Sequence, residues 1–411
     1  MKKLTKQSNI SPRLRWAYLL LGFLIMMCLG TVYSWSVFRS PIEELYDLSF
    51  TQSGLPYMTS LGFYALCMFI TGKYLDKHSP RLIITIGTIL VAIGWILSSY
   101  APNIFVLTIS YGVIIGAGVG IIYGAPITII AKLFPEKRGL AGGLLLTGFG
   151  LSPLLTAPIA ESLIENYGVT NTFFILGISF GIILPILAYP FGYIDDTNNS
   201  NLFSITSTQN CINDISTSNM LKSKNFKGLY VNFMIGTMIG LMLIGITSNV
   251  GVEFIKLSPK TVALLMSLFA VFNGIGRPVF GWMIDKLSTK KAMLISYGLI
   301  ITAALLMLLA KEGSFIIFSI AFSIFWFNLG GWLAIAPAST LTMYGIRHYC
   351  QNYGVVFTAY GIGAIISVLI SGLLIDVIQN YDSIFYFVMG LCILGLLFSG
   401  FIPQSKSREI I

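Results

Sequence analysis

Long apolar runs separated by short polar segments divide the chain along almost its whole length. Twelve of these runs reach about 20 residues, the length that an α-helix needs to cross the hydrocarbon core of a bilayer. We predict helices at residues 16–38, 55–75, 81–100, 104–131, 138–162, 170–193, 228–250, 261–284, 291–310, 314–344, 352–377 and 383–403. The first run follows a basic segment, as a signal peptide would, but it is too long and lacks a cleavage pattern. It is therefore interpreted as the first span.

Composition agrees with a membrane protein. Only 10% of the residues are charged and 55% are hydrophobic, and the mean hydropathy is +0.83. Soluble domains carry about 25% charged residues, so the chain lacks the polar groups needed to cover a surface in water. The five cysteines lie far apart with no Cys-x-x-Cys spacing, which argues against a disulfide framework or a zinc site. We expect no metal and no cofactor.

Positive charge is distributed unevenly between the two sides of the predicted spans. If the N-terminus is cytoplasmic, the inner segments hold 20 of the 25 Lys and Arg residues, and the outer loops hold four. Such asymmetry sets orientation in membranes. It predicts a multi-pass protein of the cytoplasmic membrane with both termini cytoplasmic. The net charge of +9 is therefore attributed to orientation and not to nucleic-acid binding.

The two ends of the chain repeat one plan. Between the sixth and seventh spans, an Asn/Ser/Thr-rich stretch indicates a flexible linker. We therefore predict a six-helix bundle at 1–193, a cytoplasmic linker at 194–227 and a second six-helix bundle at 228–411.

Short motifs recur in the same order on either side of this linker. GKYLDK matches GWMIDK at an offset of 209 residues. Two further pairs match at an offset of 211 residues: GIIYGAP with GWLAIAP, and GLLLTGFG with GVVFTAYG. Together they predict an all-α membrane protein of two pseudo-symmetric bundles with a substrate site between them near the midplane. Because one chain supplies both halves, we expect a functional monomer.

These motifs resemble the major facilitator superfamily, whose signature is the Gly-x-x-x-Asp-Lys loop after spans two and eight. GTVYSWSVF, FPEKRGLAGGLLLTGFG and NGIGRPVFGWMID look like its oxalate/formate antiporter and bacterial monocarboxylate transporter branch. The resemblance implies a transporter in which the loop residues act as conformational latches; the alternative is that they only anchor the cytoplasmic face. They are Gly72, Asp76, Lys77, Arg81, Gly281, Asp285 and Lys286.

One charge remains inside a predicted span. Arg277 lies eight residues before Asp285, or about 12 Å of helix, which places it near the midplane. A charge there costs about 2.5 to 3.5 kcal/mol on insertion scales, so it normally faces a cavity or a partner. Asn273, Gly274 and Gly281 share its helical face. The alternatives are snorkelling to the interface, or bonding to helix carbonyls freed near Pro278.

All 16 Asp and Glu residues lie outside the predicted membrane centre, so no carboxylate is expected to neutralise Arg277. Its planar fork suits a substrate carboxylate, and the resemblance implies the same role. Animal monocarboxylate transporters carry an acid one turn before the arginine, where this chain has Asn273. The oxalate antiporters that the chain resembles carry a second cation, a lysine in span eleven. The matching position in this chain is Tyr360. One cation with a phenol suits a monoanion better than a dianion.

Other residues are weaker candidates for the same site. Phe149 is the pseudo-symmetric counterpart of Tyr360, and the two rings could roof the site. The remaining candidates, for each of which plain packing is the alternative, are Tyr33, Tyr123, Asn328 and Trp332.

These observations predict a secondary transporter of a lactate-, pyruvate- or formate-type monocarboxylate, working by alternating access with proton coupling or anion exchange. Its partners are a small organic anion, with or without protons, and the lipid bilayer. The alternatives are an oxalate/formate-type dicarboxylate antiporter, an exporter of lipophilic cations and a carboxylate sensor that does not transport. Exporter sites usually contain intramembrane acids, and neither a signalling domain nor an enzyme-like constellation is apparent.

Overall fold

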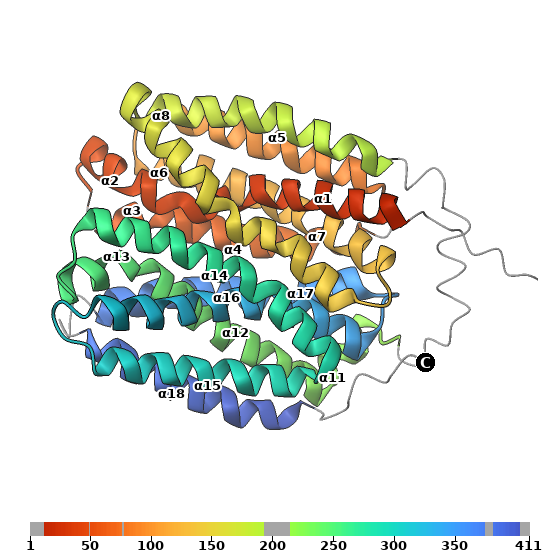
Figure 1. Cartoon of the computed structure of the whole chain (residues 1–411). Helices are drawn as coiled ribbons and strands as arrows, with labels where there is room; N and C mark the ends of the chain where they lie inside the picture. Colours follow the sequence, from red (N-terminus) through yellow and green to blue (C-terminus); the bar gives the residue numbers. More distant parts are fainter. Residues whose placement is uncertain (1–11, 49, 76–77, 193–213, 375–380, 403–411) are drawn as a thin grey trace, which may run out of the picture.

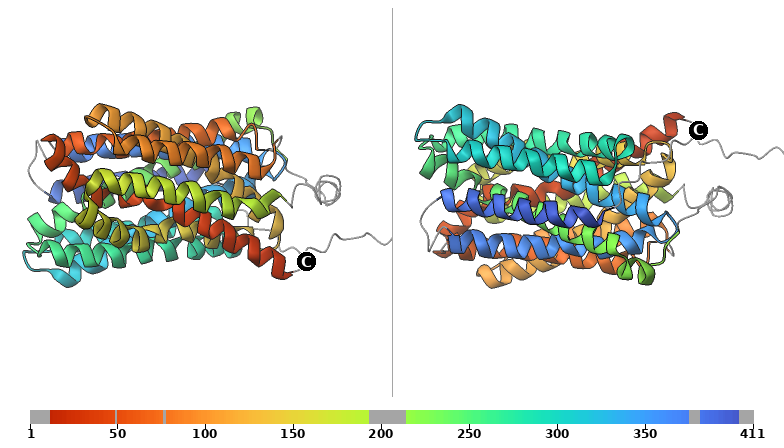
Figure 2. Two further views of the ribbon diagram at one scale, coloured as in Figure 1. Left: turned by 90° about the horizontal axis from the view of Figure 1, so that it is seen from above. Right: turned by 90° about the horizontal axis from the view of Figure 1, so that it is seen from below.

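The computed structural model describes residues 12–48, 50–75, 78–192, 214–374 and 381–402, and these residues form helices joined by short connections. Helices of the two halves run side by side along one direction (Figure 1), and the views from above and below show the same arrangement (Figure 2). We call the end of the bundle at which α1 begins and α18 ends the terminal end; the sequence predicts that it is cytoplasmic.

The N-terminal half covers the first six predicted spans. Its helices are α1 (Pro12–Leu29) with η1 (Gly30–Ser34) and α2 (Trp35–Tyr46), α3 (Phe50–Ser53), α4 (Leu55–Thr71), α5 (Pro80–Ser99), α6 (Ile104–Leu107) with the π-helical η2 (Thr108–Ile115) and α7 (Gly116–Leu133), and α8 (Arg138–Ala188) with η3 (Tyr189–Phe191).

The C-terminal half covers the other six. Its helices are α11 (Thr217–Lys222), α12 (Lys224–Gly245), α13 (Thr247–Asn249) with η4 (Val250–Phe254), α14 (Pro259–Lys286), α15 (Thr289–Leu308), α16 (Phe315–Tyr344), α17 (Tyr349–Leu373), and α18 (Asp382–Phe398) with η6 (Ser399–Phe401).

The prediction of twelve crossings is confirmed. Ten described helical segments are long and apolar enough to span a bilayer, and α4 is a shorter apolar helix. One of the ten, α8, contains two of the predicted spans. It bends at Gly168, where φ is 79° and ψ is 164°, a conformation that glycine adopts without steric cost. The chain is therefore an all-helical, multi-pass membrane protein.

Local signals for helix starts recur in both halves, as the sequence repeat predicts. The Ser79 hydroxyl accepts a hydrogen bond from the Leu82 amide at the start of α5, at 3.2 Å. At the start of α15, Ser288 accepts one from the Lys291 amide, also at 3.2 Å. Each serine satisfies an amide that the first helical turn leaves without a partner. The two loop motifs thus end in the same type of cap.

The predicted linker at 194–227 differs in part from the expectation of a flexible segment. Residues 193–213 lie outside the described part of the chain, but the following residues are ordered against the C-terminal half. The Ile215 amide donates to the Tyr344 carbonyl at 3.0 Å, and the Thr217 hydroxyl donates to Asn352 at 2.8 Å. These contacts, together with the fully buried Met220, stabilise α11. Whether 194–227 is the boundary between two domains stays a prediction.

The halves meet mainly through two helix pairs, α4 with α17 and α8 with α14, with smaller contacts of α8 with α16 and of α7 with α17. Hydrogen bonds that join described residues of the two halves lie near the middle of the bundle or toward the terminal end. One example joins the Thr128 hydroxyl of α7 and the Cys350 thiol of α17, at 3.3 Å.

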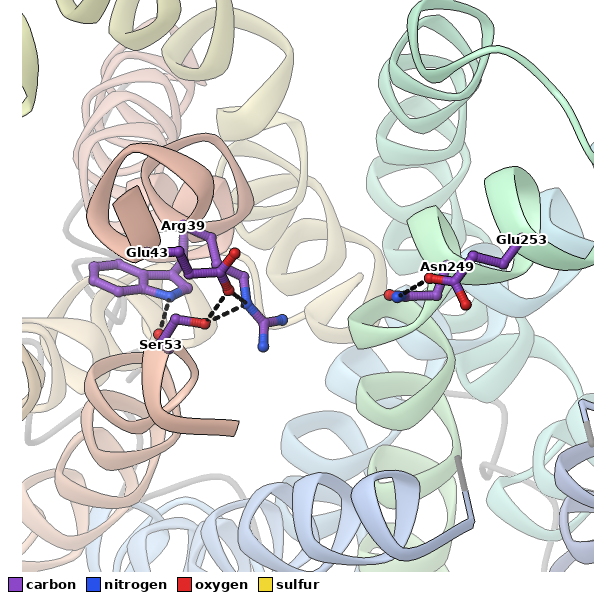
Figure 3. A network of polar contacts seen from close by, with 6 residues as sticks. Arg39, Glu43, Ser53, Asn249 and Glu253 are labelled. Carbon is purple, nitrogen blue, oxygen red and sulfur yellow. Dashed lines mark hydrogen bonds and ion pairs between the residues drawn. The ribbon is translucent and has the colours of Figure 1, made fainter. Parts of the chain in front are cut away.

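At the opposite end, the polar contacts drawn in Figure 3 stay within one half. Arg39 binds Glu43 at 3.2 Å and Ser53 at 2.8 Å in the N-terminal half, and Asn249 donates to Glu253 at 2.9 Å in the C-terminal half. The described hydrogen bonds therefore tie the halves together more toward the terminal end.

Candidate functional site

Arg277 is fully buried at the contact between α14 and α8. Its Nη1 donates to the Leu146 carbonyl of α8 at 2.5 Å, and its Nη2 donates to Asn273 Oδ1 at 3.2 Å. Its Nε has no hydrogen-bond partner among the described residues, and no described Asp or Glu forms an ion pair with it. The guanidinium is thus held in place by dipoles while its charge stays uncompensated.

Asn273 positions the arginine. It lies one turn earlier on α14, and its Nδ2 donates to the Trp326 carbonyl of α16 at 3.1 Å. Helix α16 comes this close because Gly330 faces Asn273; a Cβ at position 330 would lie 1.9 Å from the Asn273 carbonyl oxygen. The amide therefore has one orientation, with its nitrogen toward α16 and its oxygen toward Arg277.

Glycines of α8 let the arginine reach that helix. A Cβ at Gly143 would lie 2.5 Å from the Arg277 carbonyl oxygen, and a Cβ at Gly150 would lie 3.0 Å from Arg277 Nε. Between these glycines, Thr147 donates to the Gly274 carbonyl at 3.1 Å. Side chains at either glycine would push α8 away from α14, so the close approach depends on their absence.

An aromatic ring faces the guanidinium, and further rings pack against that ring. The Arg277 Cζ lies 5.6 Å from the centre of the Phe149 ring, within the range of a cation–π contact. Phe149 in turn contacts Tyr33 at 5.0 Å and Tyr123 at 5.5 Å between ring centres. The hydroxyls of Tyr33 and Tyr360 are 2.8 Å apart and join the two halves. The structure thus brings Arg277, Asn273, Phe149, Tyr33, Tyr123 and Tyr360 into one connected group.

Two further rings belong to this group, although the sequence did not single them out. Tyr64 of α4 stacks on Phe149 with ring centres 5.9 Å apart, and Phe357 of α17 contacts Tyr64 at 4.9 Å and Tyr360 at 4.9 Å. A signal for Tyr64 was present, because the repeat offset of 209 takes Asn273 to position 64. Phe357 lies on the same helical stripe as Tyr360, three residues away.

Asn328 and Trp332 are not brought to this group. Asn328 accepts from the Ser296 hydroxyl at 2.7 Å, and the Trp332 ring packs on Tyr297 at 5.2 Å and against Gly236. These partners lie on α12 and α15, inside the C-terminal bundle. Helix α16 instead turns Gly330 toward Asn273. The face of α16 that carries Asn328 and Trp332 therefore points away from α14.

The loop motif after span eight forms a contact between the halves. Both carboxylate oxygens of Asp285 accept from backbone amides at the start of α8, from Gly139 at 3.2 Å and from Leu140 at 3.0 Å. A carboxylate there neutralises the positive end of the helix. Gly281 allows the approach, since its Cβ would lie 2.3 Å from the Gly139 carbonyl oxygen. Lys286 is exposed at the end of α14.

The loop motif after span two is described only in part, because Asp76 and Lys77 lie outside the described residues. Gly72 packs against α17, where its Cβ would lie 2.5 Å from the Cys350 carbonyl oxygen. Arg81 lies within the N-terminal half, with its Cζ 4.5 Å from the centre of the Tyr189 ring. Gly72 is thus at the contact between the halves, and Arg81 is not.

Comparisons with known proteins identify the family. The model of the Major Facilitator Superfamily matches residues 16–209 and 226–410, so the chain belongs to this superfamily. It is 28% identical over 347 residues to the oxalate:formate antiporter of Oxalobacter formigenes, covering 84% of this chain and 81% of that one.

Two other relatives are similar at lower coverage or identity. The chain is 25% identical to the MFS-type transporter YhjX of Escherichia coli, with 86% of each chain covered. It is 27% identical to monocarboxylate transporter 12 of Xenopus laevis, covering 76% of this chain and 72% of that one. The branch suggested by the sequence motifs is therefore confirmed.

Proposed function

We propose that the protein is a secondary transporter that moves a small carboxylate through the centre of the bundle by alternating access, with Arg277 as the anion anchor. The observation that carries this proposal is a fully buried guanidinium with one unpartnered nitrogen and no described carboxylate paired to it. A buried charge without a counter-charge is costly. A substrate carboxylate would remove that cost by binding the fork in two places.

A monocarboxylate of the lactate, pyruvate or formate type fits the charge of the site best. The described group supplies one cation, and the position where a second cation would suit a dianion holds Tyr360. One relative carries both oxalate and formate in its name, so exchange of a dicarboxylate remains the second candidate. Competition by oxalate against labelled lactate separates the two, since a dianion would leave one charge without a fixed cation.

Exchange of anions is the transport mode that the site supports. Asn273 cannot titrate, and no described acid lies beside Arg277 to carry a proton. The empty site keeps its full positive charge, so reorientation without a bound anion should be slow. If transport is coupled to a proton, that proton would then have to move with the substrate or through water.

The contact between the two halves at the terminal end supports a transport cycle in which Asp285 acts as a latch. Its two bonds to the start of α8 hold the halves together on that side, and opening the terminal end would break both. We propose that this side faces the cytoplasm, that the protein resides in the cytoplasmic membrane and that a single chain transports.

The test uses purified protein in proteoliposomes and labelled lactate. Uptake is measured into empty vesicles, with and without an inward proton gradient, and into vesicles preloaded with unlabelled lactate. We expect preloading to increase the initial rate of lactate uptake several-fold. We expect Arg277→Lys to abolish uptake, because lysine keeps the positive charge but lacks the two-pronged guanidinium that binds a carboxylate. Equal rates with and without internal lactate would count against exchange. Normal uptake by Arg277→Lys would count against the anchor.

A further inference from the structure

A second buried donor of this kind lies in the enclosure, by which we mean the connected group of residues around Arg277. Its members are Arg277, Asn273, Phe149, Tyr33, Tyr64, Tyr123, Phe357 and Tyr360. The hydroxyl of Tyr353 on α17 is buried and makes no hydrogen bond of ordinary geometry with a described residue; the phenol of Tyr123 is its neighbouring polar group. The Tyr353 ring stacks on Tyr349 with centres 5.7 Å apart and meets Phe357 edge-on, also at 5.7 Å. Tyrosine hydroxyls normally find a partner when buried, because leaving one unsatisfied costs the lost bond to water.

The surroundings of this hydroxyl point to the substrate site. The phenol of Tyr123 lies beside the Tyr353 hydroxyl, and both phenols lie within range of the Arg277 charge. Phe357 connects Tyr353 to the enclosure, since its ring contacts Tyr123 at 5.5 Å as well as Tyr353. Two other buried donors without described partners, Tyr111 Oη and Trp332 Nε1, lie in the cores of single halves.

The other central phenols are less available as donors. Tyr33 and Tyr360 bind each other at 2.8 Å, so one of their protons is already used. Tyr353 Oη and Arg277 Nε are the two described donors of the enclosure that are buried and make no hydrogen bond of ordinary geometry. A small acid that accepts from both would satisfy both. Its carboxylate would take Arg277, and an oxygen on the adjacent carbon would be the next acceptor along the molecule.

Resting on carboxylate transport at Arg277, we propose that Tyr353 is a specificity-determining residue that donates a hydrogen bond to the oxygen on carbon 2 of the substrate. The site then selects 2-hydroxy and 2-oxo acids, such as lactate and pyruvate, over acids of equal charge that lack this oxygen, such as propionate. Propionate keeps the contact with Arg277 but leaves the Tyr353 hydroxyl buried and unsatisfied.

The experiment measures inhibition of labelled lactate exchange by unlabelled lactate, pyruvate and propionate in proteoliposomes. Wild type, Tyr353→Phe and the matched control Tyr349→Phe are compared; the control removes the hydroxyl of the neighbouring ring on the same stripe. We expect Tyr353→Phe to lower the affinity for lactate and pyruvate about five- to tenfold and to leave that for propionate nearly unchanged. Tyr349→Phe should keep the wild-type ratio.

Thermal unfolding of the purified proteins separates binding from a structural role. Without ligand, Tyr353→Phe should melt at or above the wild-type temperature, because it loses a hydroxyl that makes no hydrogen bond of ordinary geometry. The rise in melting temperature on adding lactate should be smaller than in wild type. A lower melting temperature without ligand, or an unchanged ratio of lactate to propionate affinity, would overturn the proposal.

The failure of the inference is distinguishable from failure of the proposed function. If wild type exchanges lactate and Arg277→Lys does not, but Tyr353→Phe retains the wild-type ratio, only the role of Tyr353 is wrong. If wild type neither binds nor exchanges any of these acids, the carboxylate function fails and this inference fails with it.

Discussion

The two main helix pairs between the halves are equivalent by the sequence repeat, yet they differ where the proposed substrate site lies. At the terminal end they are alike: Gly281 of α14 meets Gly139 of α8, and Gly72, which caps the end of α4, meets Cys350 of α17. In the middle both pairs have close glycine contacts, such as Gly150 of α8 with Arg277 and Gly361 of α17 with Ala65. They differ in that α4 and α17 also meet through the rings of Tyr64 and Phe357, whereas α14 brings the charge of Arg277 to α8.

This difference shows what a buried charge requires. The offset of 209 takes Asn273 and Arg277 of α14 to Tyr64 and Met68 of α4. Arg277 is stabilised by a carbonyl of the opposing helix, and that carbonyl is reachable because Gly143 and Gly150 leave no side chains in the way. On the other pair, rings fill the space and no charge is present at the equivalent position. One contact therefore carries the proposed anion anchor, and the other supplies rings around it.

The largest expected effect on lactate exchange comes from making the α14–α8 pair resemble the α4–α17 pair at position 277. Arg277→Met introduces the residue found at the equivalent position of α4. We expect at least about a 100-fold loss of lactate exchange, because several charge-assisted hydrogen bonds are removed. The melting temperature should not fall, since a buried cation without a counter-charge is replaced by an apolar side chain. Met68→Leu is the matched control and should retain exchange within about twofold.

The next largest effect tests the neutral partner of the arginine. Asn273→Asp puts a carboxylate beside Arg277, where it competes with the substrate, and we expect about a tenfold or greater loss of lactate affinity at neutral pH. Protonation of the new carboxyl removes the competing charge, so affinity should recover as the pH falls. Inhibition constants measured from pH 8 downward check this.

Asn273→Ala is the control for that prediction. It loses the positioning bond to Arg277 without adding a titratable group, so its affinity should fall without gaining a pH dependence. An Asn273→Asp variant whose affinity is unchanged, or follows pH as wild type does, would contradict the role given to the amide.

A smaller effect should come from the close approach of α8 and α14. Gly143→Ala places a methyl group against the Arg277 backbone, whereas Gly142→Ala meets nothing within 4 Å. We expect the first to weaken closure by about 1–3 kcal/mol and the second to have no effect on closure. Maleimide labelling of Cys350, which is buried at the terminal end, reports closure in a background lacking the other cysteines. Equal labelling rates in the two variants would show that the approach is not required.

The smallest effect should come from the loop aspartate. Asp285→Asn keeps the side-chain shape but removes a charge worth about 0.3–1 kcal/mol at a helix start. We expect Cys350 labelling to become about two- to fivefold faster. Glu136→Gln is the control, because the Glu136 ion pair with Arg15 is exposed and lies within the N-terminal half; exposed pairs contribute little. If the two variants behave alike, Asp285 anchors the surface and is not a latch.

The sequence by itself determined the crossings and the position of the charge. A length of apolar residues is enough to predict a span, because lipid leaves the backbone no partner outside a helix. The distance from Asp285 predicts that Arg277 lies near the midplane, and the positions of the acids predict that no carboxylate pairs with it; no described Asp or Glu does so. The repeat offsets also predicted which helices are equivalent, although the match of Asn273 with Tyr64 that follows from them was not drawn from the sequence.

Only the tertiary structure decided which side chains meet the arginine. Periodicity tells which residues share a helical face, but not how each helix is rotated against its neighbours. The rotation of α16 is set by Gly330 against Asn273, and it directs Asn328 and Trp332 into the C-terminal bundle. The rotation of α17 brings Phe357 and Tyr353 to the enclosure. These rotations depend on packing between helices distant in sequence, and local pattern carries no record of them.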